Sequence, residues 1–169
     1  DFAPRSDVEI DLLHYLRPRF GGHVSYERIG FGDGVFQIYS FLRDTGRHPE
    51  PGWLAEELKS GDRNATIGRY GTEAREPICA ATMELFAEIY GAEAGNLALK
   101  CLATSVYIGG GIAPKVLPVL ERGGFMRAFV DKGRLSAILK SVEVQVVLNP
   151  RAALIGAAHL GRRHLGGSE

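Results

Sequence analysis

The stretch from Ser105 to Leu117 constrains the fold of this chain more than any other. Residues 105–108 are largely apolar or β-branched and lead directly into Gly109-Gly110-Gly111, after which Pro114 stands where a helix can begin. This pattern predicts a strand, a tight turn and a helix. Glycines remove the Cβ atoms that keep a ligand from the backbone, and a helix start offers N–H groups that suit a phosphate. A nucleotide-phosphate site and an ordinary strand-to-helix connection both remain open.

Composition narrows the classes of partner. The 169 residues contain 20 Lys and Arg and 20 Asp and Glu, so charge favours neither nucleic acid nor an anionic membrane. The sequence shows no signal peptide and no apolar run near the roughly 20 residues that span a bilayer, so we expect a cytoplasmic protein. The five His residues are scattered, and no metal site is expected. Cys79 and Cys101 fall in apolar helical patterns, which favour buried free thiols over a disulfide.

Hydrophobic spacing predicts helices through the first part of the chain. Ser6 can cap a first helix, a very short one contains Glu27, and a third carries an apolar face over residues 35–42. Residues 44–72 are polar and rich in turn signals. We therefore expect them to form a peripheral excursion with one short helix at 53–58.

Two further helices are predicted between residues 73 and 101. The first runs from about 73 to 90 with Pro77 in its first turn, and Gly91 is expected to break it. The second covers residues 93–101, where small side chains allow another backbone to pack closely.

Strands and helices alternate in the last part of the chain. After the helix at Pro114, the pattern predicts short helices at 125–130 and 134–140, a strand at 142–148, and a final helix at 152–160 that packs on a sheet. Two strands, each followed by a helix, predict a parallel α/β lobe with a helical excess. Two strands are too few for an independent sheet. We therefore expect a fragment, with more strands supplied from outside this chain.

Three kinds of nucleotide-binding turn compete at Gly109-Gly110-Gly111. A P-loop requires Gly-Lys-Ser/Thr, whereas Lys115 lies between Pro114 and Val116. A Rossmann turn requires a third glycine in place of Pro114 and an acidic residue after the next strand, which ends at Asn149 and lies too far away. The paired-glycine turn of the actin-like and sugar-kinase ATPases, whose backbone lies against adenosine and the α-phosphate, fits the residues as they stand.

Several collinear motifs span nearly the whole chain and are weakest over residues 44–72. They are Asp1-Phe2-Ala3-Pro4, Gly22-His23-Val24-Ser25-Tyr26-Glu27-Arg28-Ile29, Gly95-Asn96-Leu97-Ala98-Leu99, Gly109-Gly110-Gly111-Ile112-Ala113-Pro114, Asp131-Lys132-Gly133-Arg134 and Gly156-Ala157-Ala158-His159-Leu160. In this order the motifs resemble the bacterial glucokinase family.

The resemblance implies an ATP-dependent glucose kinase of the actin-like (ribonuclease H-like) fold that uses Mg²⁺ with ATP. Residues 1–169 would form part of its larger, C-terminal lobe. The resemblance assigns Glu27 to the glucose hydroxyls, and Gly109, Gly110 and Gly111 to the nucleotide. A carboxylate suits the sugar role because it accepts two hydrogen bonds from neighbouring hydroxyls. From the residues alone, a solvated glutamate in a first helical turn remains the alternative.

Several parts of the family's site are expected to lie before Asp1. They are the catalytic Asp, a Glu-Gly-Gly-His sugar motif and the first phosphate-binding turn, so no catalytic residue is assigned in this chain, and alone it is expected to be inactive. Gly32-Asp33-Gly34 replaces a Gly-Pro-Gly loop, and its role stays open. The expected partners are glucose, ATP, the missing N-terminal lobe and a second copy in a homodimer. The alternatives are a kinase for another hexose and a non-catalytic nucleotide-binding module.

Overall fold

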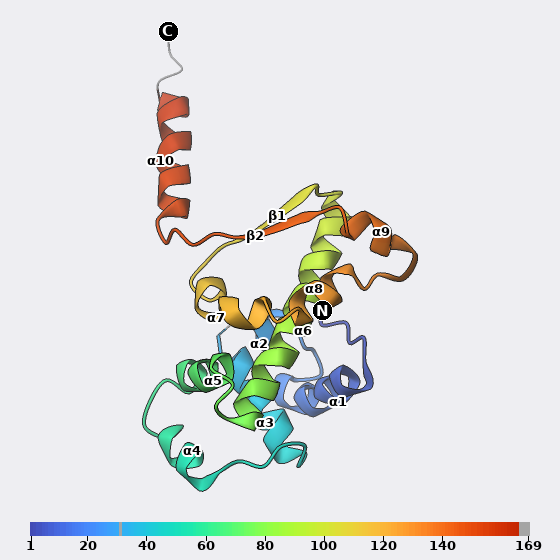
Figure 1. The fold of residues 1–169 in the computed structure, drawn as a ribbon, viewed down its shortest axis with the longest axis vertical. Coiled ribbons are helices and arrows are strands. Elements are labelled where there is room, and N and C mark those ends of the chain that lie inside the picture. Colours follow the sequence, from blue (N-terminus) through green and yellow to red (C-terminus); the bar gives the residue numbers. More distant parts are fainter. Residues whose placement is uncertain (31, 166–169) are drawn as a thin grey trace.

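The structure is a computed structural model that describes residues 1–30 and 32–165 (Figure 1). Helices dominate it, and two short strands form a parallel pair. The elements in chain order are α1 (Asp7–Leu16), the 3-10 helix η1 (Arg17–Phe20), α2 (Glu27–Gly30), α3 (Gly34–Asp44), α4 (Gly52–Glu57), α5 (Arg63–Thr72), α6 (Pro77–Cys101), β1 (Ser105–Ile108), α7 (Ala113–Leu120), α8 (Gly124–Val130), η2 (Gly133–Leu135), α9 (Ser136–Leu139), β2 (Glu143–Val146) and α10 (Ala152–Leu165).

Local signals place the first helices where the sequence predicts them. The Ser6 hydroxyl accepts a hydrogen bond from the Glu9 N–H at 3.3 Å and so caps α1. α2 is one turn long, and its Ile29 is fully buried. α3 buries Ile38 and Tyr39 on its inner face, as the apolar spacing predicts.

α6 is the central helix, and most of the other helices pack around it (Figure 1). It is continuous over 25 residues, so the predicted break at Gly91 is wrong. A Cβ at Gly91 would lie 2.1 Å from the carbonyl oxygen of Phe125, and one at Gly95 would lie 2.4 Å from that of Phe129. Both partners belong to α8. These glycines therefore let the backbone of α8 reach α6, and they do not end the helix.

Residues 44–72 are not one excursion, because they divide into two parts. α4 lies at the margin of the molecule, although Leu54 is fully buried (Figure 1). α5, which the sequence pattern did not predict, packs against α6 and α7 and buries Ile67 completely. This second part belongs to the core.

The side chain of Arg122 fixes the end of α5. Its guanidinium donates hydrogen bonds to the carbonyl oxygens of Gly71 at 3.2 Å and Thr72 at 2.6 Å. These carbonyls belong to the last turn of α5, where a helix lacks internal donors. Arg122 follows α7, so the bonds join α5 to α7.

β1 and β2 form the predicted parallel pair, with Ser105 opposite Glu143 and Ile108 opposite Val146. β2 is shorter than the predicted strand at 142–148. The helix-rich body with a small parallel sheet matches the α/β class that the sequence predicts.

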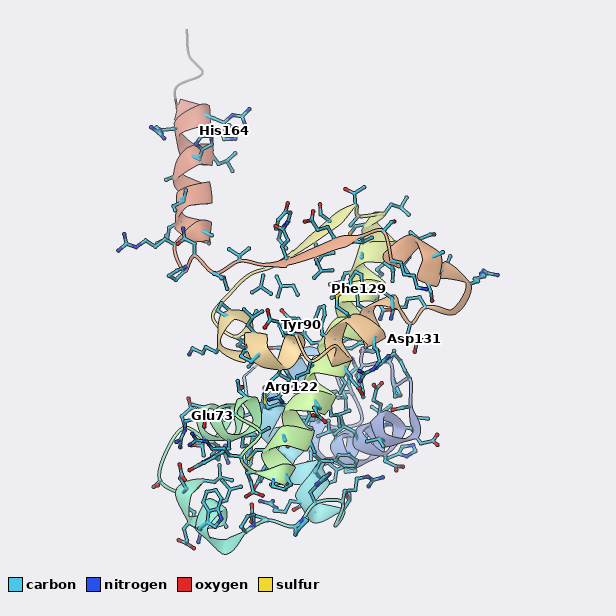
Figure 2. The ribbon with its side chains drawn as sticks, viewed as in Figure 1. Glu73, Tyr90, Arg122, Phe129, Asp131 and His164 are labelled. Carbon is cyan, nitrogen blue, oxygen red and sulfur yellow. The ribbon has the colours of Figure 1, made fainter. Side chains whose placement is uncertain are left out.

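α10 does not pack on the sheet as the sequence predicts. It points away from the rest of the chain, and His164 near its far end lies well clear of the body (Figures 1 and 2). Leu154, Ile155 and Leu160 are all exposed. Its small and apolar residues indicate a packed helix, but no element of the described chain covers them. None of the described helices is both long and apolar enough to cross a membrane.

The two cysteines differ in environment. Cys79 is fully buried in α6, and burial raises the pKa of its thiol to about 12. Cys101, at the end of α6, is exposed, which corrects the expectation that both are buried. Both are free thiols, as predicted.

Candidate functional site

The glycine turn has the predicted strand–turn–helix structure. β1 ends at Ile108, and α7 begins at Ala113 with a proline in its first turn. Gly110 has φ +102°, a conformation that other residues rarely adopt. A Cβ built on any of the three glycines meets no atom within 4 Å. The turn therefore presents open backbone to solvent, which is what a ligand that approaches the main chain requires.

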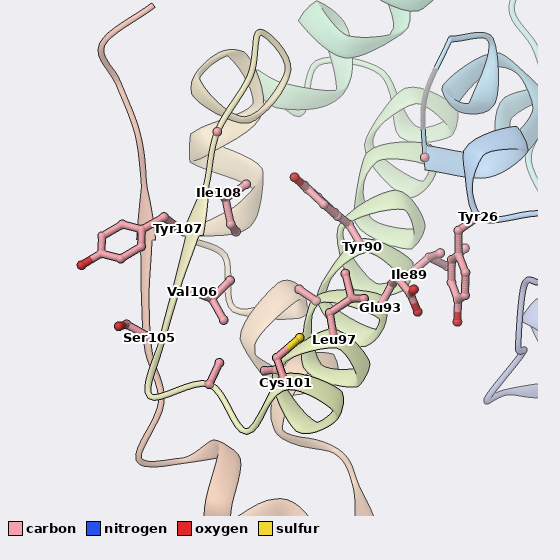
Figure 3. Close-up of a pocket in the computed structure, with 15 residues that line it drawn as sticks. Tyr26, Ile89, Tyr90, Glu93, Leu97, Cys101, Ser105, Val106, Tyr107 and Ile108 are labelled. Atoms are coloured by element: carbon pink, nitrogen blue, oxygen red, sulfur yellow. The ribbon is translucent and has the colours of Figure 1, made fainter. Parts of the chain in front are cut away.

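A groove with a volume of about 480 Å³ lies beside this turn, between β1 and the second half of α6 (Figure 3). We call it the β1 groove. Val106 and Ile108 of β1 point toward α6, whereas Tyr107 points to the other side of the strand (Figure 3). Leu97 and Cys101 line the groove from α6. Its surface is mainly apolar, so it suits packed side chains better than a charged ligand.

A second hollow of about 610 Å³ lies between α5, the start of α3 and the start of α7, and we call it the α5 cavity. Val35, Met83, Ile112 and Val116 contribute apolar wall, and polar groups stand among them. It is lined by Gly30, Gly32, Val35, Asp62, Asn64, Ala65, Gly68, Arg69, Thr72, Glu73, Met83, Ile112, Lys115 and Val116. A cavity of this size with apolar walls and a few polar groups is typical of sites for small organic ligands.

Two features of the α5 cavity bear on what it could bind. The buried hydroxyl of Thr72 has no hydrogen-bond partner within the described part of the chain. Lys115, in the first turn of α7, is exposed at the cavity and lies shortly after the glycine turn in sequence. An ammonium group there would attract an anionic group of a ligand.

Gly30 connects the two hollows, because it lines both of them. Gly109 lines the β1 groove, and Ile112 lines the α5 cavity. The glycine turn thus runs from one hollow to the other, opposite the end of the short helix that begins at Glu27. The structure therefore brings the predicted nucleotide turn and the helix of the predicted sugar ligand to the same region of the surface.

Glu27 is the first residue of α2 and is exposed. The turn of α2 is closed by the carbonyl oxygen of Tyr26, which accepts the N–H groups of Ile29 at 3.1 Å and Gly30 at 2.7 Å. The fully buried side chain of Ile29 anchors this turn to the body of the protein. Arg28 lies over the ring of Phe20, with 4.9 Å from its guanidinium carbon to the ring centroid. An exposed carboxylate on an anchored turn is available to a ligand, and its assignment to a sugar remains a prediction.

The Gly32-Asp33-Gly34 segment is held by contacts that the sequence pattern does not predict. A Cβ at Gly34 would lie 2.1 Å from the carbonyl oxygen of Ile29, so only glycine fits there. Asp33 accepts a hydrogen bond from the amide of Asn64 at 3.1 Å. Asn64 lies in the segment that the sequence predicts to be peripheral. The Asp62 cap of α5 is the local signal for this helix: its carboxylate accepts the Asn64 and Ala65 N–H groups at 3.0 and 3.1 Å.

Within residues 1–30 and 32–165, no three His, Cys, Asp or Glu side chains are placed to hold a metal ion.

Comparison with known proteins agrees with the resemblance seen in the motifs. A family model described as Glucokinase matches residues 1–164. The chain is 44% identical to a glucokinase of Synechocystis sp., over 94% of this chain and 48% of the relative. It is 43% identical to a glucokinase of Nostoc punctiforme, over 94% of this chain and 50% of the relative. The chain thus spans about half the length of these curated relatives.

Two solved structures share the fold. A glucokinase from an Antarctic psychrotroph matches with a TM-score of 0.80 and 28% identity, over 95% of this chain and 47% of that one. A glucokinase from Balamuthia mandrillaris, solved in complex with glucose, matches with a TM-score of 0.78 and 20% identity, over 95% of this chain and 44% of that one. These matches place the helix-rich body and its parallel strands in the fold of the solved glucokinases.

Proposed function

This chain belongs to the glucokinase family, and from that premise we propose that it supplies the nucleotide side and one sugar ligand of an ATP-dependent glucokinase. The reaction would transfer the γ-phosphoryl group of ATP to the 6-hydroxyl of glucose. The observation that carries the proposal is the open glycine turn, which joins two hollows beside the helix of Glu27. The full-length enzyme means this chain together with the part of its relatives' length that it does not span.

The nucleotide is proposed to lie along the glycine turn with its base in the α5 cavity. The apolar walls from Val35, Ile112 and Val116 suit the faces of a purine ring, and the polar groups among them suit its edges. The backbone of Gly109, Gly110 and Gly111 is open to the adenosine and the α-phosphate. Lys115 is exposed at this cavity and follows the glycine turn in sequence, so its ammonium group would add positive charge for the phosphates.

Glu27 is proposed to accept hydrogen bonds from two neighbouring hydroxyls of glucose. Its exposure supports this role, because a sugar must reach it from solvent. A hexose without a hydroxyl at one of these positions would leave the carboxylate partly unpaired in a closed site, which is the usual source of selectivity for sugars.

The remaining half of the full-length enzyme is proposed to supply the catalytic Asp, the other sugar ligands and the first phosphate-binding turn. Phosphoryl transfer depends mainly on positioning and on stabilising charge, so a chain without these groups contributes binding and not the proton transfer. Mg²⁺ would accompany the phosphates of ATP, because this ion bridges phosphate oxygens and usually needs only one or two protein carboxylates. No step of the proposal requires a metal held by this chain.

The proposal is tested at Glu27 in the full-length enzyme. Glu27→Gln removes a charged acceptor, and the KM for glucose should rise about tenfold to a hundredfold while the KM for ATP stays within about twofold. Glu84→Gln, at another exposed position, is the matched control and should leave both constants unchanged. An unchanged KM for glucose in Glu27→Gln would remove Glu27 from the site. A higher kcat/KM for another hexose than for glucose would show that this other hexose is the preferred substrate.

A further inference from the structure

The side chain of Asn64 joins two segments that line the α5 cavity. α5 forms one wall, and the segment that leads into α3 contributes another part of the lining, through Gly32 and Val35. Asn64 of α5 lines the cavity, and its side-chain amide donates to the Asp33 carboxylate at 3.1 Å. Its side-chain oxygen accepts the N–H of Phe36 at 3.0 Å. Both the amide nitrogen and the amide oxygen of Asn64 therefore bind to the segment at the start of α3.

The start of α3 depends on this contact. Asp33 stands at the N-cap position of α3, but its side chain makes no capping bond to the helix. The free N–H of Phe36 is satisfied instead by Asn64, a residue 28 positions further along the chain. Gly34 adds a rigid stop, because the carbonyl of Ile29 occupies the space of a Cβ there. Two fixed points thus define where α3 begins.

Neighbouring contacts hold the pair in register. The Asp62 carboxylate fixes the backbone of Asn64 by accepting its N–H at 3.0 Å. Arg63 lies 3.6 Å from the second oxygen of Asp33 and stacks over the ring of Phe36, at 4.0 Å from its guanidinium carbon to the centroid. Asp62 thus fixes the backbone of Asn64 within α5, and Arg63 holds the carboxylate of its partner Asp33.

We propose that Asn64 and Asp33 are a positioning pair that sets the width of the α5 cavity and, through it, the affinity of the enzyme for ATP. This inference rests on the proposed function. A ligand in the cavity touches both walls, so the hydrogen bonds that join them keep the cavity shaped before the ligand arrives. When they are lost, binding has to order the walls as well, and affinity falls. Glu27 belongs to α2, outside the pair's contacts, so the sugar side is unaffected.

The experiment compares steady-state constants for ATP and for glucose in the full-length enzyme. Asn64→Ala should raise the KM for ATP about tenfold, the loss expected for one or two hydrogen bonds, with the KM for glucose within about twofold. Asn64→Asp should raise the KM for ATP further than Asn64→Ala does, because two carboxylates then face each other. The exchanged pair, Asp33→Asn with Asn64→Asp, should return the KM for ATP to within about threefold of the original. In it an amide at position 33 donates to a carboxylate at position 64, which still accepts the Phe36 N–H.

Two further variants keep the test decisive. Asp33→Ala removes the bond from an exposed side chain and leaves the Phe36 N–H satisfied, so it decides the matter if Asn64→Ala does not fold. Asp11→Asn is the matched control, since it removes the ion pair between Asp11 and Arg47, which also joins distant segments but lies outside the cavity. It should leave the KM for ATP unchanged.

Three results would overturn the inference in an enzyme that phosphorylates glucose. The first is a KM for ATP that stays unchanged in both Asp33→Ala and Asn64→Ala. The second is an equal rise in the KM for ATP and the KM for glucose. The third is an exchanged pair whose KM for ATP is as high as that of Asn64→Asp alone. An enzyme without ATP-dependent phosphorylation of glucose would overturn the proposed function itself, which is a different observation from any of these three.

Discussion

At the scale of single residues, a substitution in the glycine turn distinguishes a nucleotide site from an ordinary strand-to-helix connection, which the sequence alone leaves open. Gly111 has open space where a Cβ would stand and does not need a positive φ, so alanine fits the folded chain there. An ordinary strand-to-helix connection would tolerate that methyl group. A turn against which a nucleotide packs would not, because the added carbon occupies the ligand's place.

We therefore predict that Gly111→Ala raises the KM for ATP of the full-length enzyme about tenfold and changes the free energy of unfolding by less than about 0.5 kcal/mol. Urea unfolding and initial-rate kinetics measure the two quantities. Gly110→Ala is the contrasting control: φ is +102° there, so it should destabilise the fold by about 1 kcal/mol or more. An unchanged KM in Gly111→Ala would make the turn an ordinary connection.

Residues within one motif can be predicted from sequence, and residues joined by the fold cannot. The glycine turn and Glu27 lie in short continuous patterns, so the sequence alone is enough to single them out. Asn64 carries no such signal, because its partners Asp33 and Phe36 stand 31 and 28 positions away. The exposure of the Cys101 thiol is equally hidden, since helical spacing alone does not show that the end of α6 borders a groove.

At the scale of elements, α6 and α8 show how tertiary contact overrides helix propensity. Glycine in a helix interior is unfavourable relative to alanine by roughly 1 kcal/mol, which is why the sequence predicts a helix end at Gly91. The structure keeps the helix because the carbonyl of Phe125 needs the space. Local spacing predicts where helices form, but whether a glycine breaks one depends on what packs against it.

This packing gives a prediction with opposite signs at two helical glycines. Gly91→Ala should destabilise the chain by at least about 2 kcal/mol, because its Cβ would lie 2.1 Å from a backbone oxygen that cannot move alone. Gly68→Ala, in α5, meets no atom within 4 Å and should stabilise the chain by about 0.5–1 kcal/mol. Denaturant unfolding with equal m-values compares them. A stabilising Gly91→Ala would show that α8 does not approach α6 in this way.

At the scale of the whole molecule, uncovered surfaces account for two predictions that failed, the packing of α10 on a sheet and the burial of Cys101. The two-stranded sheet, the apolar β1 groove and the exposed apolar side chains of α10 are all features of elements that normally pack against others. The predicted packing of α10 on a sheet is wrong for the described elements, because they leave Leu154, Ile155 and Leu160 exposed. We infer that the other half of the relatives' length covers these surfaces.

Cys101 lines the β1 groove, so the rate at which its thiol is labelled measures whether the other half of the enzyme covers this groove. In the 169-residue chain, iodoacetamide at pH 8 should label Cys101 and spare Cys79, whose thiol is buried and has its pKa raised to about 12. Cys101→Ser should then leave the native chain unlabelled until urea exposes Cys79. In the full-length enzyme, labelling of Cys101 should slow at least about tenfold. Equal rates of Cys101 labelling in the two proteins would show that the β1 groove stays open in the full-length enzyme.

Catalysis is the property that this chain is predicted to lack when it stands alone. Its groups are proposed to bind the nucleotide and one side of the sugar. Proton transfer from the sugar hydroxyl and the first phosphate contacts are proposed to come from the other half. The 169-residue chain with ATP, Mg²⁺ and glucose should form no ADP above background. Addition of the other half, produced separately, should restore glucose-dependent ADP formation, and restoration should be weaker when the chain carries Glu27→Gln. Turnover by the chain alone would show that a complete catalytic site lies within these residues.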